Sequence, residues 1–168
     1  MKKIDIRDVC NVKIGQTEDK EAGTGVTVVI AEQGMTAGLA IRGGGPASRE
    51  TYLLNPLSSA SVIHAIVLGG GSAFGLDAAG GVMQYLEEKR IGFPVRNTVV
   101  PLVCQSDIFD LLVGTDRRPD QAMGRKACEA AEKGLYRDGC YGAGTGATVG
   151  KLNGMEHCMK SGIGSFAV

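Results

Sequence analysis

A glycine-rich stretch is the part of this sequence whose residue types and spacing most directly suggest chemistry. It runs Gly69-Gly70-Gly71-Ser72 and closes at Gly75, directly after an apolar run over residues 63–68 and directly before a predicted helix. A glycine turn between a strand and a helix presents backbone N–H groups at the helix N-terminus, and such groups bind anions. The stretch therefore has two interpretations: an anion or nucleotide site, or a tight turn that lets the helix pack closely on a sheet.

The nucleotide interpretation meets two objections in the sequence. The glycines are spaced G-x-G-x-x-x-G, whereas the dinucleotide-binding fingerprint is G-x-G-x-x-G. An acidic residue should follow about 20 residues later to bind a ribose, but residues 89–93 lack one and Glu88 is the last acid before them. A nucleotide-binding domain that uses Gly69 to Gly75 therefore stays open only as the less favoured alternative.

The cysteines and histidines do not form a pattern typical of a metal site. No C-x-x-C pair is present, and the gaps between the cysteines fit no zinc template. Their odd number, in a chain whose charged first residues resemble no signal peptide, indicates free thiols in a reducing compartment. We expect no metal, and we expect the cysteines to act as small core residues. The cysteines are Cys10, Cys104, Cys128, Cys140 and Cys158, and the histidines are His64 and His157.

The length of the chain is that of one ordinary domain. The chain has 168 residues, 26 of them glycine, with 18 basic and 18 acidic side chains and a formal charge of zero. A neutral chain is not typical of a nucleic-acid-binding protein, and no apolar run approaches the roughly 20 residues that cross a bilayer. We therefore predict a cytoplasmic protein without nucleic-acid or membrane partners.

The hydrophobic pattern places several strands and two helices around the glycine stretch. Helices are predicted from Leu76 to Arg90 and from Asp120 to Lys133, the second between Pro119 and a Gly134 cap. Gly80 and Gly81 make the first helix slim, which predicts close packing against a sheet. Strands are predicted over residues 9–15, 25–32, 35–42, 63–68, 146–151 and 162–168, with a Gln33-Gly34 hairpin between the second and third. The chain stops inside the last predicted strand, so we expect an incomplete domain with an apolar sheet surface that needs a partner.

Five segments in order give the chain a family resemblance. The segments are residues 42–56, 65–83, 99–111, 124–131 and 142–151, the last ending in Gly-Ala-Thr-Val-Gly-Lys. Together they resemble the L-aminopeptidase/D-esterase (DmpA-like) peptidases, and the nylon-oligomer hydrolases among them, over essentially the whole chain.

The resemblance implies an N-terminal-nucleophile hydrolase with an α/β/β/α four-layer sandwich of the ornithine acetyltransferase type. Residues 1–168 would be one incomplete domain, most of the α subunit of a precursor that cleaves itself. The new N-terminal Ser or Thr would be the nucleophile, with its α-amino group as general base. It would lie in the C-terminal β subunit and not in this chain. The resemblance also implies peptide or amide substrates, no cofactor and a homo-oligomer, with a tetramer as the expected form.

Individual residues take roles only through this resemblance. Lys151, which ends the last motif, is matched to an active-site lysine that would stabilise an anionic intermediate. By the same resemblance, Phe109 stands where relatives have a tyrosine near the substrate, and without the hydroxyl it cannot donate to an oxyanion. Gly70, Gly71 and Ser72 are candidate backbone donors or substrate contacts. The alternatives are a solvated lysine, a packing turn and, for the whole chain, a non-catalytic remnant or binding protein with the same fold.

Overall fold

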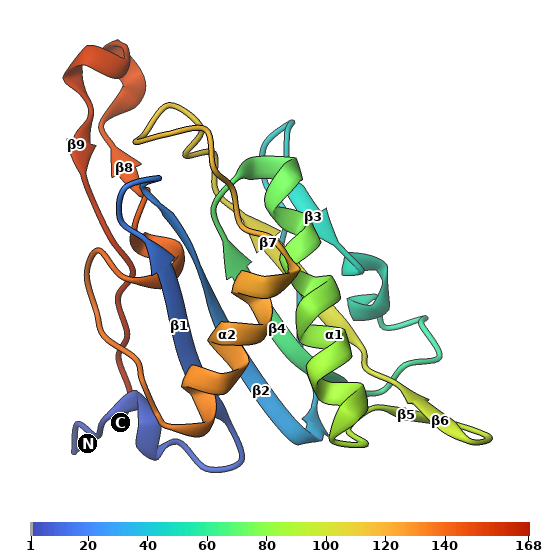
Figure 1. Cartoon of the computed structure of the whole chain (residues 1–168). Helices are drawn as coiled ribbons and strands as arrows, with labels where there is room; N and C mark the ends of the chain where they lie inside the picture. The colour runs from blue at the N-terminus through green and yellow to red at the C-terminus, as the bar shows by residue number, and fades with distance from the viewer. Residues whose placement is uncertain (1) are drawn as a thin grey trace.

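The computed structural model describes residues 2–168, and its centre is a five-stranded mixed sheet in the order β1-β2-β4-β7-β3 (Figure 1). All neighbouring strands are antiparallel except β4 and β7, which are parallel. The predicted strand over residues 63–68 is confirmed almost to the residue. The strands are β1 (Lys13–Asp19), β2 (Thr24–Met35), β3 (Ala47–Arg49), β4 (Ile63–Gly69) and β7 (Val103–Asp107).

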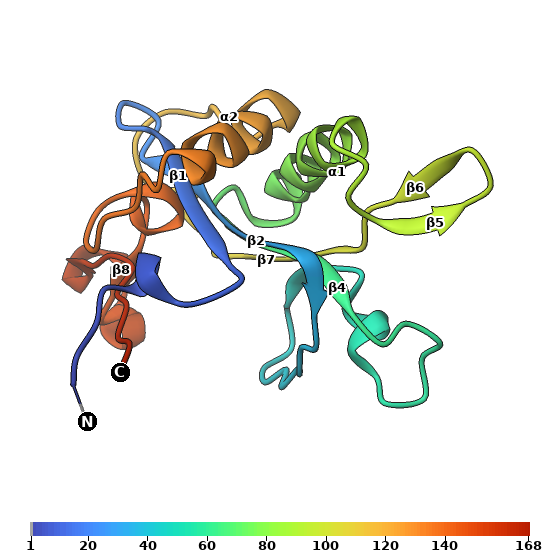
Figure 2. The same ribbon diagram turned by 90° about the horizontal axis from the view of Figure 1, so that it is seen from below.

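Both α-helices lie on the same face of this sheet, as Figure 2 shows. They are α1 (Ala78–Glu88) and α2 (Gln121–Glu132). Alternate side chains of the strands point at the helices, and each fully buried Val or Leu contributes about 1.5–3 kcal/mol. The core between the two layers consists mainly of Val26, Val28, Ile30, Ala65, Val67, Val82, Leu86, Val103, Ala127 and Cys128.

The ends of α2 follow the sequence signals closely. The Asp120 side chain caps the helix by accepting a hydrogen bond of 2.8 Å from the Met123 N–H. At the other end Gly134 has a φ of +60°, the left-handed conformation that stops a helix. The first predicted helix is shorter than expected, because residues Ser72–Asp77 form a 3-10 helix, η3, and α1 begins only at Ala78.

The glycines of α1 pack against α2, which corrects the prediction that they face a sheet. A Cβ on Gly81 would overlap the Gln121 carbonyl oxygen at the start of α2. In return, a Cβ on Gly124 of α2 would overlap the Ala78 carbonyl oxygen of α1. The slim stretch therefore lets the two helices approach each other on top of the sheet.

The predicted hairpin at Gln33-Gly34 is wrong. β2 continues through these residues to Met35, and residues 36–46, which the structure describes, form no strand. A register shift between Ile30 and Met35 lets this long strand keep its pairing with β4. The first strand is also displaced from residues 9–15 to Lys13–Asp19, and a short 3-10 helix, η1 (Ile6–Asp8), precedes it.

The last third of the chain is less regular than predicted. The expected strand over residues 146–151 shrinks to β8 (Thr148–Val149), which pairs with an unpredicted strand, β9 (Met159–Lys160). The expected strand over residues 162–168 is wrong, because these residues make only isolated bridges. This hairpin stands on the side of β1, whereas an unpredicted hairpin projects from the opposite side (Figures 1 and 2). The second hairpin consists of β5 (Phe93–Val95) and β6 (Thr98–Val100). The remaining 3-10 turns are η2 (Thr51–Leu54), η4 (Gly142–Gly144), η5 (Lys151–Asn153) and η6 (Met155–His157).

The second face of the sheet carries no α-helix among the described residues. Segments between β2 and β4 extend on that side (Figure 2), and Val29, Ile66 and Leu68 are only partly buried there. The predicted α/β class is confirmed, with one helix layer on one sheet layer. The other two layers of the expected sandwich stay a prediction. No helix within residues 2–168 is long and apolar enough to cross a membrane.

Candidate functional site

The glycine turn lies at the sheet edge where the parallel strands β4 and β7 both end. Two backbone hydrogen bonds tie the ends together: Ile108 N–H donates to the Gly69 oxygen over 2.8 Å, and Ser72 N–H donates to the Ile108 oxygen over 3.0 Å. Ligand sites in open α/β sheets often form outside the carboxyl ends of the strands. The structure thus places Gly70, Gly71, Ser72 and Phe109 at one edge.

The backbone N–H groups of this turn are used inside the chain. Gly70 donates to the Gly25 oxygen over 3.0 Å, and Gly71 donates to Asp110 Oδ1 over 2.6 Å. Ser72 N–H is taken by Ile108. The three candidate donors are therefore not free to bind an oxyanion or a phosphate in this conformation. This favours the packing-turn interpretation over the nucleotide-binding one, whereas a contact between the Ser72 side chain and a substrate stays a prediction.

Steric contacts explain why the turn is built from glycine. A Cβ on Gly70 would overlap Asp110 Oδ2 and the Thr24 hydroxyl, and one on Gly75 would overlap the Gly70 carbonyl oxygen. Gly71 has a φ of +80°, which an L side chain rarely adopts. The turn is therefore a place of close approach between chain segments that are far apart in sequence.

Asp110 joins three of those segments. Its side chain, 4% exposed, accepts hydrogen bonds from Gly71 N–H and from Thr24 Oγ1, the latter over 2.7 Å. Gly146, from the last sequence motif, packs directly against the same carboxylate. These contacts show that Asp110 orients the glycine turn.

Two polar residues of β7 complete this buried cluster, and the sequence analysis missed both. Gln105, 2% exposed, donates to the Gly75 oxygen over 2.7 Å and accepts from Ala79 N–H over 2.9 Å. Its amide also donates to Asp107 Oδ1 over 2.9 Å. Burial raises the pKa of Asp107 to about 7, and the nearby charge of Asp110 acts in the same direction. The sequence does carry a signal for them: Gln105 and Asp107 are two positions apart, so they lie on the same face of a strand that begins with apolar residues.

The solvent side of the same edge is apolar. Phe109 is 55% exposed, and Ile108 and Leu112 beside it are exposed as well. The Arg118 guanidinium stacks on the exposed ring of Phe74, 4.1 Å from its centroid. An aromatic and apolar rim with one cation can contact a flexible amide substrate, but it contains no nucleophile with a base beside it.

Lys151 lies apart from this cluster. It begins η5, directly after Gly150 and the short strand β8, and its side chain is exposed. Within residues 2–168 its ammonium group makes no hydrogen bond or ion pair. The Gly-Ala-Thr-Val-Gly-Lys motif therefore begins at Gly146, which packs against Asp110, and ends at the exposed Lys151. Its catalytic role stays a prediction.

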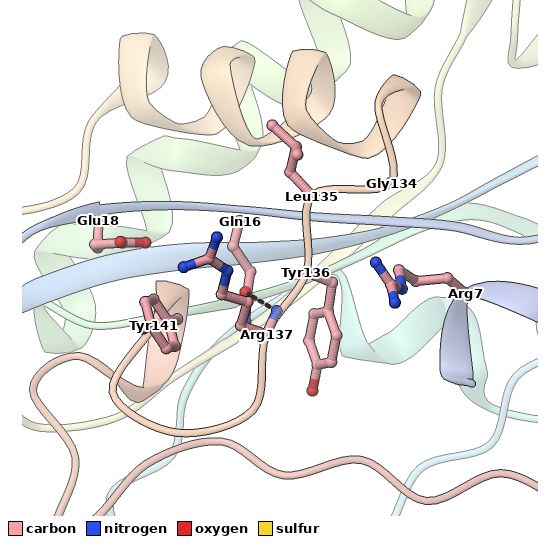
Figure 3. Close-up of a pocket in the computed structure, with 8 residues that line it drawn as sticks. All are labelled: Arg7, Gln16, Glu18, Gly134, Leu135, Tyr136, Arg137 and Tyr141. Carbon is pink, nitrogen blue, oxygen red and sulfur yellow. Dashed lines mark hydrogen bonds between the residues drawn. The ribbon is translucent and has the colours of Figure 1, made fainter. Parts of the chain in front are cut away.

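A hollow of about 270 Å³ next to β1 contains none of the predicted site residues (Figure 3). Two of its charged side chains have partners within the chain: Arg7 is paired with Asp5 at 2.6 Å, and Glu18 accepts a hydrogen bond from Gly142 N–H. Gln16 Oε1 accepts a hydrogen bond from Arg137 N–H over 2.8 Å, the dashed line in Figure 3. The hollow is lined by Arg7, Gln16, Glu18, Gly134, Leu135, Tyr136, Arg137 and Tyr141.

The thiols and imidazoles are scattered. In the described part of the chain no group of three or more His, Cys, Asp or Glu residues could hold a metal ion. Cys104 and Cys128 are buried, and burial raises the pKa of Cys128 to about 12. The prediction of core cysteines is wrong for Cys10 and Cys140, which are exposed because they lie in irregular segments outside the helix–sheet core.

The comparison with known families decides what this architecture belongs to. Residues 5–166 match peptidase family S58. The chain is a member of that family. The resemblance drawn from the five sequence segments is thereby confirmed over nearly the whole length of the S58 chain.

Curated relatives carry hydrolase names. An uncharacterized aminopeptidase of Mycobacterium leprae is 39% identical over 165 residues, which cover 89% of the S58 chain and 46% of the relative. A 6-aminohexanoate-oligomer endohydrolase of Paenarthrobacter ureafaciens is 35% identical over 150 residues, which cover 87% and 39%. The chain thus spans less than half the length of these relatives.

Solved structures share the fold at low sequence identity. A protein from Pyrococcus horikoshii OT3 superposes with a TM-score of 0.67 at 21% identity, over 84% of the S58 chain and 44% of its own. A β-aminopeptidase of a Burkholderia species superposes with a TM-score of 0.57, also at 21% identity, over 84% and 42%. These likenesses establish the fold of the S58 chain.

Proposed function

We propose that this chain is the amino-terminal part of an N-terminal-nucleophile amidohydrolase that cleaves peptide or amide bonds after it has cleaved itself. The observation that carries the proposal is the match to peptidase family S58 over residues 5–166. The names of the relatives, an aminopeptidase and an amide-oligomer hydrolase, support an amide bond as the target. Their greater length supports a catalytic contribution from a segment that follows Val168.

In this proposal the nucleophile is a Ser or Thr released as a new N-terminus in that segment. Its hydroxyl attacks the substrate carbonyl carbon while its own α-amino group takes the proton. The amine product leaves with that proton, and water then hydrolyses the acyl ester. The Lys151 ammonium would stabilise the negative oxygen of each tetrahedral intermediate. Phe109 would contact the substrate but, lacking a hydroxyl, could not donate to that oxygen.

The partners follow from the same proposal. The sheet face that carries Val29, Ile66 and Leu68 is where a second sheet would pack, completing the α/β/β/α sandwich with the C-terminal β subunit. A homo-oligomer, with a tetramer as the expected form, and a cytoplasmic location complete the proposal. Light scattering on the matured protein tests the assembly, and a strict αβ monomer at micromolar concentration would contradict it.

The decisive experiment reads and expresses the gene beyond Val168. Intact-mass measurement should show two fragments with a new N-terminal Ser or Thr, and the matured protein should release amine from short peptides or amide oligomers. Replacement of that Ser or Thr by Ala should abolish both cleavage and hydrolysis. A stop codon at this point, or an uncleaved and inactive protein, would favour the non-catalytic remnant instead.

A further inference from the structure

The ammonium group of Lys160, at the end of β9, binds three backbone carbonyl groups. It donates to the Gly144 oxygen over 3.4 Å, to the Ala147 oxygen over 3.3 Å and to the Ser161 oxygen over 3.2 Å. An ammonium group has three N–H donors and no acceptor, so these bonds use all of its donors. Lys160 is therefore bound to the backbone on both sides of the β8–β9 hairpin, although the residue is exposed.

Two of these carbonyl groups belong to residues 142–147, the anchor segment, which is fixed to the core of the chain. Ala143 N–H donates to the Thr27 hydroxyl of β2 over 3.1 Å. Gly146 packs against the Asp110 carboxylate beside the glycine turn. The first five residues of the anchor segment are buried. The anchor segment thus has a defined place relative to the sheet and the glycine turn.

The β8–β9 hairpin leaves the anchor segment and is joined to it at the hairpin's base. The ladder between the strands has only two residue pairs, the first of them Thr148 with Lys160. Beside it, Ser161 N–H donates to the Ala147 oxygen over 2.9 Å. Backbone hydrogen bonds farther out, within residues 151–158, stay inside the hairpin, and this part extends beyond the end of the sheet (Figure 1). The direction of the hairpin is therefore set at its base, where Lys160 lies.

The position of Lys151 depends on that direction. Only Gly150, with a φ of +78°, separates Lys151 from the end of β8. Within residues 2–168 the Lys151 ammonium makes no hydrogen bond or ion pair that would fix it separately. A rotation of the hairpin about its base would thus carry Lys151 with it. A displacement of about 1 Å is enough to cost a catalytic group most of its effect.

We infer that Lys160 is a positioning residue, which fixes the β8–β9 hairpin on the anchor segment and thereby places Lys151. The inference rests on the proposed function, in which Lys151 stabilises the tetrahedral intermediate. Hydrogen bonds from a charged donor are stronger than those between neutral groups, and three carbonyl oxygens that converge on one point need a cation there. One lysine of the hairpin is thus bound by its own chain, and it presents the other.

Hydrogen–deuterium exchange of the intact protein, including the segment after Val168, tests the fixing of the hairpin. Lys160→Met keeps the length of the side chain but removes its donors. Amides of residues 147–161 should exchange about tenfold faster in this variant, while those of β2 and β4 should not change. Lys160→Arg retains N–H donors and should restore most of the protection. Unchanged exchange in Lys160→Met would overturn the inference.

A matched control for this experiment is Lys126→Met. Lys126 is an exposed lysine of α2, remote in sequence from the hairpin, and the substitution is chemically the same. Its exchange should follow that of the wild type throughout residues 147–161. Faster exchange of the hairpin in both variants would mean that the loss of any positive charge loosens it, and would overturn a specific role of Lys160.

Steady-state kinetics test whether the fixed hairpin places Lys151. Lys160→Met should lower kcat for amide hydrolysis about tenfold and leave KM nearly unchanged, because Lys151 acts only on the intermediate. Added to Lys151→Ala, the same change should slow hydrolysis little further, since the residue that it positions is already absent. A purely structural role predicts the same loss in both backgrounds. Equal factors in the two backgrounds would overturn the positioning of Lys151.

The two experiments separate this inference from the proposed function. If the intact wild type neither cleaves itself nor hydrolyses amides, the proposed function is refuted, and exchange alone decides whether Lys160 fixes the hairpin. In an active enzyme, faster exchange in Lys160→Met together with an unchanged kcat would overturn the inference, because the hairpin would then be loosened without consequence for Lys151.

Discussion

The glycine turn and the β8–β9 hairpin hold the residues that the sequence marks for chemistry, and they differ in how their positions are determined. The turn is surrounded by its own chain: Gln105 and Asp110 form hydrogen bonds with it, and Thr24 donates to Asp110. The hairpin has few such contacts, and its apolar residues face outward, with Leu152 98% exposed. The turn is complete in itself, whereas the hairpin and Lys151 have the exposure expected of a surface that meets another part of a protein.

The largest effect is expected when the exposed surfaces are left without any partner. The 168-residue chain produced alone should aggregate or form a molten state, because the free sheet face and the apolar residues of the β8–β9 hairpin remain in water. Size-exclusion chromatography, near-ultraviolet circular dichroism and calorimetry check this. A monomeric chain with a single cooperative melting transition would contradict this prediction and show that the β8–β9 hairpin, like the glycine turn, needs no contact with another part of a protein.

Within the intact protein, Gly75→Ala should cause the largest loss of stability. Its Cβ would overlap the Gly70 carbonyl oxygen, a backbone atom that cannot rotate away, so the free energy of unfolding should fall by about 3 kcal/mol. Gly44→Ala is the control, because no atom lies within 4 Å of its added Cβ, and it should change stability by less than about 0.5 kcal/mol. Urea unfolding measures both. Similar losses in the two variants would mean that the turn is not tightly packed.

In the hairpin region, Lys151→Ala should reverse this pattern, with a large kinetic effect and a small effect on stability. Its exposed side chain makes no ion pair in the described chain, so the melting temperature should hardly change. Amide hydrolysis or self-cleavage should slow by on the order of a hundredfold. Lys151→Arg should restore little, because a planar guanidinium does not replace a compact ammonium. Steady-state kinetics with near-normal turnover would return Lys151 to the role of a solvated lysine.

The smallest effect is expected at the rim between the two regions. Phe109→Tyr adds a hydroxyl to a ring that is 55% exposed, so stability should change by less than about 0.5 kcal/mol. One additional hydrogen bond to an intermediate should raise the turnover number about two- to tenfold. Lower turnover with an unchanged melting temperature would indicate that the ring contacts the substrate through its apolar edge only.

Local sequence signals predicted the structure correctly where it depends on residues that are close together in the chain. Asp120, Pro119 and Gly134 place the ends of α2 correctly, because capping acts within one helical turn. The apolar run over residues 63–68 predicts β4, although its Ile66 and Leu68 are only partly buried. The order of the five segments was also enough to indicate the peptidase family.

The predictions failed where distant segments compete for the same residues. Gln33 and Gly34 are residue types that favour a hairpin turn, yet pairing with β4 keeps β2 extended through them. Gly81 in a helix suggests close packing against a sheet, yet the residue next to it is Gln121 at the start of α2. In both cases a long-range contact outweighs a local preference of less than about 1 kcal/mol.

The sequence by itself determined the family, the α/β class, the main helices and the presence of a glycine turn between a strand and a helix. Only the tertiary structure decided what the turn does, because Thr24 and Asp110 are 86 residues apart in the chain and meet only after folding. The same holds for Asp107, whose raised pKa comes from burial and from a neighbouring acid, two properties that a residue acquires from its surroundings in the folded protein.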